Sequence, residues 1–269
     1  MRPIRSLVVP ICLAVLAATC VTASSARSER TAPVAHVVII VFENHEKSAV
    51  IGNAFAPAFN RYAQNYVALA DYTAVAHPSL PNYLALVSGS THGVTDDCTS
   101  CGPWLRSVGG LLSRAGRLWG GYAEGYPSSP SFAKKHMPFL YFRDGASHVH
   151  PLSSLDARHL PAYAFVAPDL CHDGHDCPLI TADAFLAHWL PPFLQSPRTA
   201  VFVIFDEGST SIGGGGRVAA FVAGTALLRH AVVQRHVDHY TVLRTVEYLF
   251  GLPLLGASRT EAPLKAIWR

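Results

Sequence analysis

The chain has few charged residues. Lys, Arg, Asp and Glu make up only 14% of its 269 residues, and the formal net charge is +3. Arg2 and Arg5 supply part of this excess, and without them 19 basic residues face 18 acidic ones, about +1. Nucleic-acid-binding domains usually carry a concentrated basic face, so this balance argues against a nucleic-acid partner. The hydrophobic fraction of 50% excludes a disordered chain and suffices for the core of one large domain.

Long hydrophobic runs are also scarce. One of them, Leu7–Ala18, follows Arg2 and Arg5 and precedes small residues, which is the pattern of a secretory signal peptide over residues 1–26. A membrane anchor is the alternative, but a bilayer span needs ~20 apolar residues. No later segment is apolar for long enough to cross a membrane. We therefore expect no stable membrane insertion and a secreted, extracellular single domain over residues 27–269.

Cysteines are few. Two of the six lie in the expected signal peptide, and the others form two close pairs, Cys98/Cys101 and Cys171/Cys177. In an exported protein, close pairs favour local disulfides. A zinc site built from all four is the alternative, although the 171–177 spacing does not match the usual pair of thiolate ligands.

Short, unbroken apolar runs alternate with amphipathic stretches along the chain. Segments 36–42 and 201–205 are rich in β-branched residues on both faces, as buried parallel strands are, and 162–166 and 217–222 are weaker versions. Helices are expected near 54–69, 82–88, 104–115, 182–189 and 240–250. This alternation predicts an α/β fold, with a mostly parallel central sheet flanked by helices on both faces.

Oxygen-rich side chains follow the two clearest strands. Glu43 and Asn44 come after the first, and Asp206 and Glu207 after the second. In parallel sheets, chemistry gathers beyond the carboxyl ends of the strands. These four residues are candidate ligands of a divalent metal, because clustered carboxylates repel one another unless a cation or proton intervenes. Solvated loop carboxylates are the alternative.

Ser79 lies in the segment His77-Pro-Ser-Leu-Pro-Asn82, ahead of an apolar run. Pro81 is typical of the first turn of a helix, where free backbone N–H groups favour an anion. Ser79 is therefore either a helix cap or a nucleophile stabilised by a neighbouring metal.

Metal-capable side chains are unusually dense between the second pair of cysteines. His172, Asp173, His175 and Asp176 lie there, on a loop that a disulfide would hold. A solvated polar loop is the alternative. His239, at the start of the last helix, would ordinarily be a cap or surface residue, and Lys134-Lys135-His136 is interpreted as a solvated surface run rather than a site for an anionic substrate.

Together these segments resemble a bacterial phosphoesterase family of secreted acid phosphatases and phospholipases C, within the alkaline-phosphatase-like superfamily. The resemblance runs from about His36 to Pro253 and favours the shorter acid phosphatase branch. The matching stretches are His36–His45, Ala76–Ser90, Pro168–Cys177, Phe205–Gly208 and Asp238–Thr245.

The resemblance implies a role for each candidate. Ser79 would be the nucleophile that forms a phosphoserine, and Glu43, Asn44, Asp206 and Glu207 would bind a divalent metal of unknown identity. The remaining candidates, His175, Asp173 and His239, would complete the phosphate pocket or bind a second metal. Glu43-Asn44 stands where alkaline phosphatases have an aspartate, and Asp206-Glu207 stands where they have Asp-His. The resemblance therefore leaves open whether one or two metal ions are bound.

The expected function is hydrolysis of a phosphomonoester, with a small phosphorylated substrate or a phospholipid headgroup as partner. A phospholipase C-type phosphodiesterase is the first alternative. A non-catalytic secreted binding module is the second.

Overall fold

The computed structural model describes residues 33–269, so the expected signal peptide lies outside the described residues. These residues form an eight-stranded sheet in the order β4-β3-β5-β1-β6-β7-β2-β8. Within it only β7 is antiparallel to its neighbours, β2 and β6, which confirms the mostly parallel sheet. The strands are β1 (His36–Phe42), β2 (Val67–Thr73), β3 (Trp119–Ala123), β4 (Val149–Pro151), β5 (Tyr163–Ala167), β6 (Thr199–Phe205), β7 (Ala220–Ala223) and β8 (Ala231–Asp238).

The two strands at the centre of the sheet, β1 and β6, are parallel neighbours. Their register pairs Val38 with Val201 and Phe42 with Phe205, so both strands end at the same level. Almost every residue of the pair is buried, as expected for strands covered on both faces. The residues that follow Phe42 and Phe205 therefore emerge side by side at one edge of the sheet.

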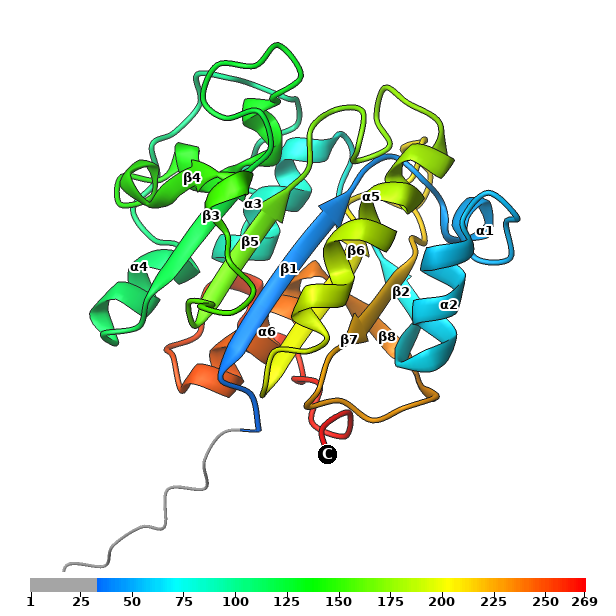
Figure 1. The fold of residues 1–269 in the computed structure, drawn as a ribbon. Helices are drawn as coiled ribbons and strands as arrows, with labels where there is room; N and C mark the ends of the chain where they lie inside the picture. The colour runs from blue at the N-terminus through cyan, green and yellow to red at the C-terminus, as the bar shows by residue number, and fades with distance from the viewer. Residues whose placement is uncertain (1–32) are drawn as a thin grey trace, which may run out of the picture. The chain divides into compact units, whose positions relative to one another are not determined.

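Helices cover both faces of the sheet, as the sequence predicts. Figure 1 shows α5 in front of the strands and α3 and α6 behind them. The helix α2 packs with α5, and α3 packs with α6. The helices are α1 (Lys47–Val50), α2 (Pro57–Asn65), α3 (Ser79–Ser88), α4 (Val108–Arg114), α5 (Leu179–Phe193) and α6 (His239–Phe250), with the 3-10 turns η1 (Lys134–His136), η2 (Pro138–Tyr141), η3 (Ala146–His148), η4 (Leu152–Ser154) and η5 (Gly256–Thr260).

Aromatic side chains join the central strands to the helices on one face. The ring of Phe42 packs against Phe59 of α2 at 4.9 Å between centroids, against Phe185 of α5 at 6.2 Å and against Phe205 of β6 at 5.5 Å. Aromatic pairs at these separations add to the stabilisation from apolar burial. This cluster fixes the end of β1 directly before Glu43.

The sequence does not predict four of the strands, β2, β3, β4 and β8. The helix expected over 54–69 is wrong at its end, because α2 stops at Asn65 and β2 starts at Val67. The strand β3 contains Gly120 and Gly121, which carry no apolar signal, and β4 has only three residues. The edge strand β8 is largely exposed and contains polar residues, so it lacks the apolar pattern of a buried strand.

Both disulfides are present. Cys98 is bonded to Cys101, and Cys171 to Cys177. This confirms the local pairing and shows that a four-cysteine zinc site is wrong. Each bridge closes a small loop, so it acts mainly on the shape of that loop.

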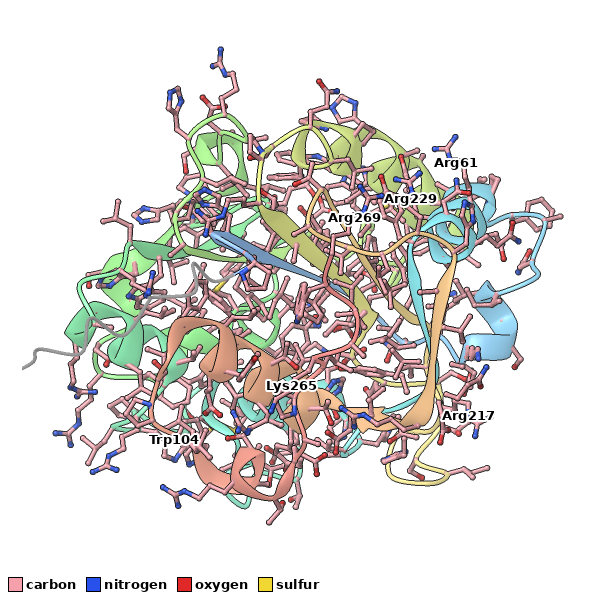
Figure 2. The ribbon with its side chains drawn as sticks, turned by 90° about the horizontal axis from the view of Figure 1, so that it is seen from below. Arg61, Trp104, Arg217, Arg229, Lys265 and Arg269 are labelled. Carbon is pink, nitrogen blue, oxygen red and sulfur yellow. A yellow bond between two sulfur atoms is a disulfide. The ribbon has the colours of Figure 1, made fainter. Side chains whose placement is uncertain are left out.

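Several surface cations lie over aromatic rings. Arg61 lies over Tyr62 of α2 at 4.8 Å, Lys265 over Tyr248 of α6 at 5.1 Å, and Arg229 over Tyr66 at 4.0 Å. Figure 2 labels these three cations, which come from separate parts of the chain. Such contacts stabilise exposed sites by about 0.5–1 kcal/mol each.

Among residues 33–269, no helix combines the length and hydrophobicity needed to span a bilayer.

Candidate active site

Ser79 is the first residue of α3 and is buried. The side chain of Asn82 fixes the segment before it, because its Oδ1 accepts hydrogen bonds from the Val75 and Ala76 amides, both at 3.0 Å. Gly89 ends the helix in the left-handed conformation, at φ 71°, which glycine adopts without strain. The helix therefore begins at Ser79, three residues earlier than the sequence predicts, and the serine occupies its first turn.

The Ser79 hydroxyl faces the carboxyl ends of the two central strands. Its Oγ lies 2.9 Å from Glu43 Oε2 and 3.1 Å from Glu207 Oε1. Its one proton can be donated to either carboxylate. The structure thus brings together a serine and two acidic side chains that the sequence separates widely.

Asp206 completes this group of carboxylates. Its Oδ1 accepts hydrogen bonds from the Glu207 amide at 2.6 Å and the Asn44 amide at 3.3 Å. Asn44 has a φ of 57°, a left-handed conformation that asparagine tolerates better than most residues. This backbone bend turns the Asn44 amide toward Asp206. The other oxygen, Asp206 Oδ2, is buried and has no hydrogen-bond partner among the described residues.

Burial strongly disfavours the ionised form of these acids. Desolvation raises the pKa of Asp206 to about 7 and, with the neighbouring Asp206 charge, the pKa of Glu207 to about 8. The pKa of Glu43 is also raised well above its ordinary value, by burial and then by the charges of Asp206 and Asp173. Carboxylates that crowd one another in this way need a proton or a cation between them.

Behind Glu43 lies a buried histidine that the sequence interpretation missed. His136 Nε2 lies 3.2 Å from Glu43 Oε1, and His136 Nδ1 lies 2.9 Å from Asp173 Oδ2. Its ring stacks on Tyr83, whose hydroxyl donates to Glu43 Oε1 at 2.6 Å. The interpretation of residues 134–136 as a solvated surface run is therefore wrong. The turn η1 directs the His136 ring inward, and no apolar pattern in the sequence marks that turn.

The loop closed by Cys171–Cys177 supplies Asp173 and His175. The Asp173 carbonyl accepts a hydrogen bond from the Glu43 amide at 2.8 Å, and Asp173 Oδ1 accepts one from the His175 amide at 2.8 Å. Burial raises the pKa of Asp173 to about 7. His175 is partly exposed, with Nδ1 2.6 Å from Asp176 Oδ1. The Asp173 carboxylate thus reaches Glu43 through His136, and His175 lies at the outer edge of the site.

His239 lies behind Asp206, at the first position of α6. Its Nε2 donates to the Asp206 backbone carbonyl at 2.6 Å, and its Nδ1 lies 2.7 Å from the Tyr72 hydroxyl. Burial lowers the pKa of His239 to about 4, so the ring is neutral. Both ring nitrogens therefore contact protein groups.

A second exposed histidine, His77, lies beside the site. Its Nδ1 is 2.5 Å from Glu207 Oε2, and about a third of its side chain is exposed. Proximity in sequence suggests a contact between His77 and Ser79, but the structure pairs His77 with Glu207 instead.

Comparisons with known proteins identify the family of this chain. Residues 53–253 match the Phosphoesterase family. A phosphatidylinositol-3-phosphatase from Mycobacterium tuberculosis is 34% identical over 250 residues, which cover 87% of this chain and 83% of that protein. The chain belongs to the phosphoesterase family. It is accordingly a phosphoric ester hydrolase.

Other relatives of this phosphoesterase are more distant. A phosphate-repressible acid phosphatase from Penicillium chrysogenum is 27% identical over 83% of this chain, which spans 63% of the fungal protein. A Vibrio parahaemolyticus protein of the alkaline phosphatase superfamily superposes with a TM-score of 0.64 at 13% identity, covering 86% of this chain and 71% of that one. The superposition confirms the alkaline-phosphatase-like fold.

The donors around Ser79 fit a divalent cation. Glu43, Asp206 and Glu207 offer carboxylate oxygens, the ligand type that hard cations prefer. Asp206 Oδ2 is a buried oxygen without a hydrogen bond, which is unfavourable unless a cation or proton satisfies it.

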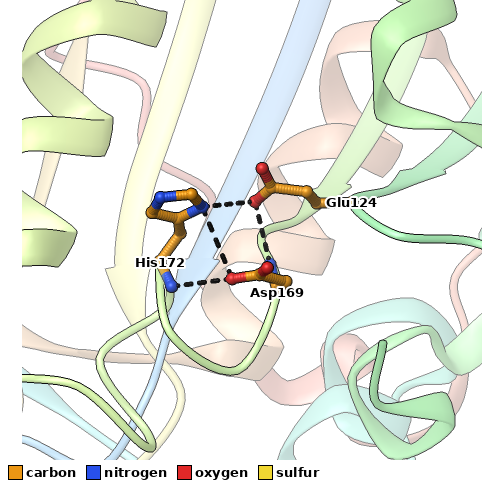
Figure 3. Close-up of side chains that lie close together, drawn as sticks. All are labelled: Glu124, Asp169 and His172. Carbon is orange, nitrogen blue, oxygen red and sulfur yellow. Dashed lines mark hydrogen bonds and ion pairs between the residues drawn. The ribbon is translucent and has the colours of Figure 1, made fainter. Parts of the chain in front are cut away.

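The phosphoesterase has a second group of metal-capable side chains. Ligand atoms of Glu124, Asp169 and His172 lie within 4.8 Å of one another. Figure 3 shows that His172 Nδ1 lies between the two carboxylates, 2.9 Å from Glu124 and 3.4 Å from Asp169. One oxygen of each carboxylate thus has a partner within the group, Glu124 Oε2 and Asp169 Oδ1. His172, from the dense segment of the sequence, therefore faces Glu124 rather than Ser79.

Proposed function

We propose that this phosphoesterase is a secreted, metal-dependent phosphomonoesterase with Ser79 as nucleophile. The observation that supports this most directly is the position of the Ser79 hydroxyl, within hydrogen-bond distance of Glu43 and Glu207 and beside buried Asp206. The two disulfides and the fungal acid phosphatase relatives support an extracellular location.

The metal ligands in this proposal are Glu43, Asn44, Asp206 and Glu207. A divalent metal held by these residues would lower the pKa of the serine hydroxyl and stabilise charge on the phosphoryl oxygens. Asp173 is not placed among these ligands, because its carboxylate faces His136 and His175. It acts on the site through His136 and Glu43.

The chain's own groups position the reaction. Ser79 Oγ attacks phosphorus in line while Glu43 or Glu207 accepts the serine proton. The P–O bond to serine forms as the P–O bond to the alcohol breaks, and the alcohol leaves with a proton from water. Water then hydrolyses the phosphoserine. Phosphoryl transfer needs positioning and charge stabilisation more than covalent assistance. His239, with both nitrogens engaged, holds the Asp206 backbone rather than contacting phosphate.

The substrate class in this proposal is a phosphomonoester. The bacterial relative is named for a phosphorylated inositol lipid and the fungal relatives as acid phosphatases, so small phosphorylated molecules and lipid headgroups are the substrates to compare.

Replacing Ser79 tests the proposal. We expect Ser79→Ala to lower kcat for an aryl phosphate by at least ~10³-fold while the thermal unfolding midpoint stays close to that of the wild type. Ser88→Ala is the matched control, since Ser88 is a buried serine of the same helix that donates to the Leu84 carbonyl. Acid quenching of wild-type enzyme during turnover should trap a phosphopeptide that contains residue 79. Undiminished turnover by Ser79→Ala would refute the assignment.

A further inference from the structure

Lys135 contacts residues beside one disulfide loop and within the other. Its Nζ lies 2.8 Å from Asp97 Oδ2 and 3.4 Å from His175 Nε2. Asp97 directly precedes the Cys98–Cys101 bridge, and His175 lies within the Cys171–Cys177 bridge. Only 19% of the Lys135 side chain is exposed. A lysine held this way differs from a mobile surface lysine.

Asp97 links this ammonium to the start of α3. While Asp97 Oδ2 binds Lys135, Asp97 Oδ1 accepts a hydrogen bond from the Leu80 amide at 3.0 Å. Leu80 directly follows Ser79, so a single carboxylate separates the Lys135 ammonium from the backbone of the nucleophile's helical turn.

The hydrogen bond between Asp97 and the Leu80 amide also reduces the ability of the N-terminus of α3 to bind an anion. The Leu80 amide is already bonded to Asp97, and Pro81 has no N–H to offer. Backbone donors at the start of α3 are therefore fewer than the sequence suggests. Glu43, Asp206 and Glu207 offset the charge of the divalent cation proposed among them, so a phosphomonoester dianion there needs further positive charge.

Lys135 supplies such a charge. Burial lowers its pKa, but the hydrogen bond to Asp97 and the charges of Asp97, Glu43 and Asp206 outweigh burial and raise the pKa overall, so the ammonium stays protonated. Of its three N–H groups, Asp97 takes one and His175 Nε2, at 3.4 Å, forms at most a weak contact. His175 accepts at Nε2 because its Nδ1 faces Asp176. One donor remains for an incoming anion.

We propose that Lys135 binds a terminal phosphoryl oxygen of the substrate and thereby favours monoesters over diesters, with Asp97 as the residue that positions it. A monoester has one more charged terminal oxygen than a diester, and this oxygen is the one that a fixed ammonium distinguishes. The inference rests on the proposed function of Ser79.

The test compares Lys135→Met with Lys134→Met. Lys134 is the matched control, because it lies in the same turn, donates to the Thr99 carbonyl of the first disulfide loop and lies 4.8 Å from the Tyr141 ring centroid. For Lys135→Met we expect two constants to rise about 10–100-fold: the inhibition constant for inorganic phosphate and the KM for aryl phosphate. This is the change expected when one charge-assisted hydrogen bond to the anion is lost. Hydrolysis of a bis-aryl phosphodiester should change less than about threefold. Lys134→Met should leave all three values near wild type.

Further variants separate substrate binding from a structural role. Lys135→Arg keeps the cation and should restore most of the phosphate affinity. Asp97→Asn should raise KM with a smaller change in kcat. An inhibition constant within twofold of wild type for Lys135→Met, or an equal loss with Lys134→Met, overturns the inference. If Lys135→Met does not fold, as judged by its thermal unfolding, Lys135→Gln and direct binding of inorganic phosphate to it decide the question.

The outcome is separable from that for Ser79. Binding of inorganic phosphate can be measured on Ser79→Ala with and without Lys135→Met, so the Lys135 result does not depend on turnover. Undiminished turnover by Ser79→Ala would refute the proposed function, whereas unchanged phosphate binding on loss of Lys135 would refute only this inference.

Discussion

Without the divalent metal of the proposed function, the folding stability of this enzyme should fall as the pH rises. The pKa of Asp206 is 3.8 in its ordinary environment and about 7 in the fold, because burial disfavours its charge. An acid whose pKa is raised on folding contributes its full stability below its unfolded pKa and loses it as the pH rises through the folded pKa. For Asp206 the window thus runs from 3.8 to about 7. The pKa of Glu207, about 8, extends it upward.

The size of the effect follows from this shift. At about 1.4 kcal/mol per pKa unit, ionising Asp206 in the metal-free fold costs on the order of 4 kcal/mol. A bound divalent cation offsets this cost. For a domain of this size, 1 kcal/mol moves the unfolding midpoint by about 2–4 °C, so metal should raise the midpoint on the order of 10 °C at pH 7.5 and much less at pH 4.5.

The assay is thermal unfolding of chelated enzyme, with single divalent metals restored one at a time at both pH values. Asp206→Asn should be less sensitive to pH without metal and respond less to metal. Asp183→Asn is the matched control, since Asp183 is also a buried carboxylate but accepts from the Ala58 and Phe59 amides at the start of α2. It should be less stable at both pH values and keep the response to metal. An equal metal response at pH 4.5 and 7.5 in the wild type would refute the argument.

Two smaller predictions concern groups around the site. Tyr72→Phe removes the hydroxyl that faces His239 Nδ1. We expect kcat to fall about fivefold, because one neutral hydrogen bond is lost, and KM to change little. An unchanged kcat would show that this contact does not position Asp206. Glu124→Gln should keep kcat/KM within about twofold, because Glu124 contacts His172 and Asp169 rather than Ser79. A loss of bound metal in Glu124→Gln, measured by elemental analysis, would show that the group around His172 holds an ion.

The sequence predicts the centre of the fold well because that centre is apolar on both faces. Strand β1 lies at its expected bounds, and β6 begins two residues before its expected start. The parallel register of β1 and β6 then places the residues after both strands at one edge of the sheet. The position of Glu43 and Glu207 on the same side of the sheet therefore follows from the strand topology. Edge elements such as β8 have no such pattern, because solvent accepts polar side chains there.

The sequence predicts the outer part of the site less well. His136 and Lys135 follow no apolar strand, and a run of three basic residues is ordinarily solvated. Their positions depend on contacts with distant loops, Asp97 on one side and Asp173 on the other. A proline-rich segment followed by an apolar run predicts the start of α3 within a few residues, but not that Leu80 already has a partner in Asp97.

These differences divide the site into two parts that the fold builds in different ways. The inner carboxylates come from the ends of buried strands, whose packing fixes the backbone that carries them. The outer groups come from segments beyond the sheet, where Lys135 and His136 of η1 directly precede the buried residue Met137. Lys135 and His136 contact partners next to or within the two disulfide loops: Lys135 contacts Asp97, which precedes Cys98, and His136 contacts Asp173, which lies between Cys171 and Cys177. The covalent bridges therefore restrict the segments that hold Asp97 and Asp173, the partners of Lys135 and His136, and reduction of the bridges should affect phosphate binding before it affects the carboxylates at the sheet edge.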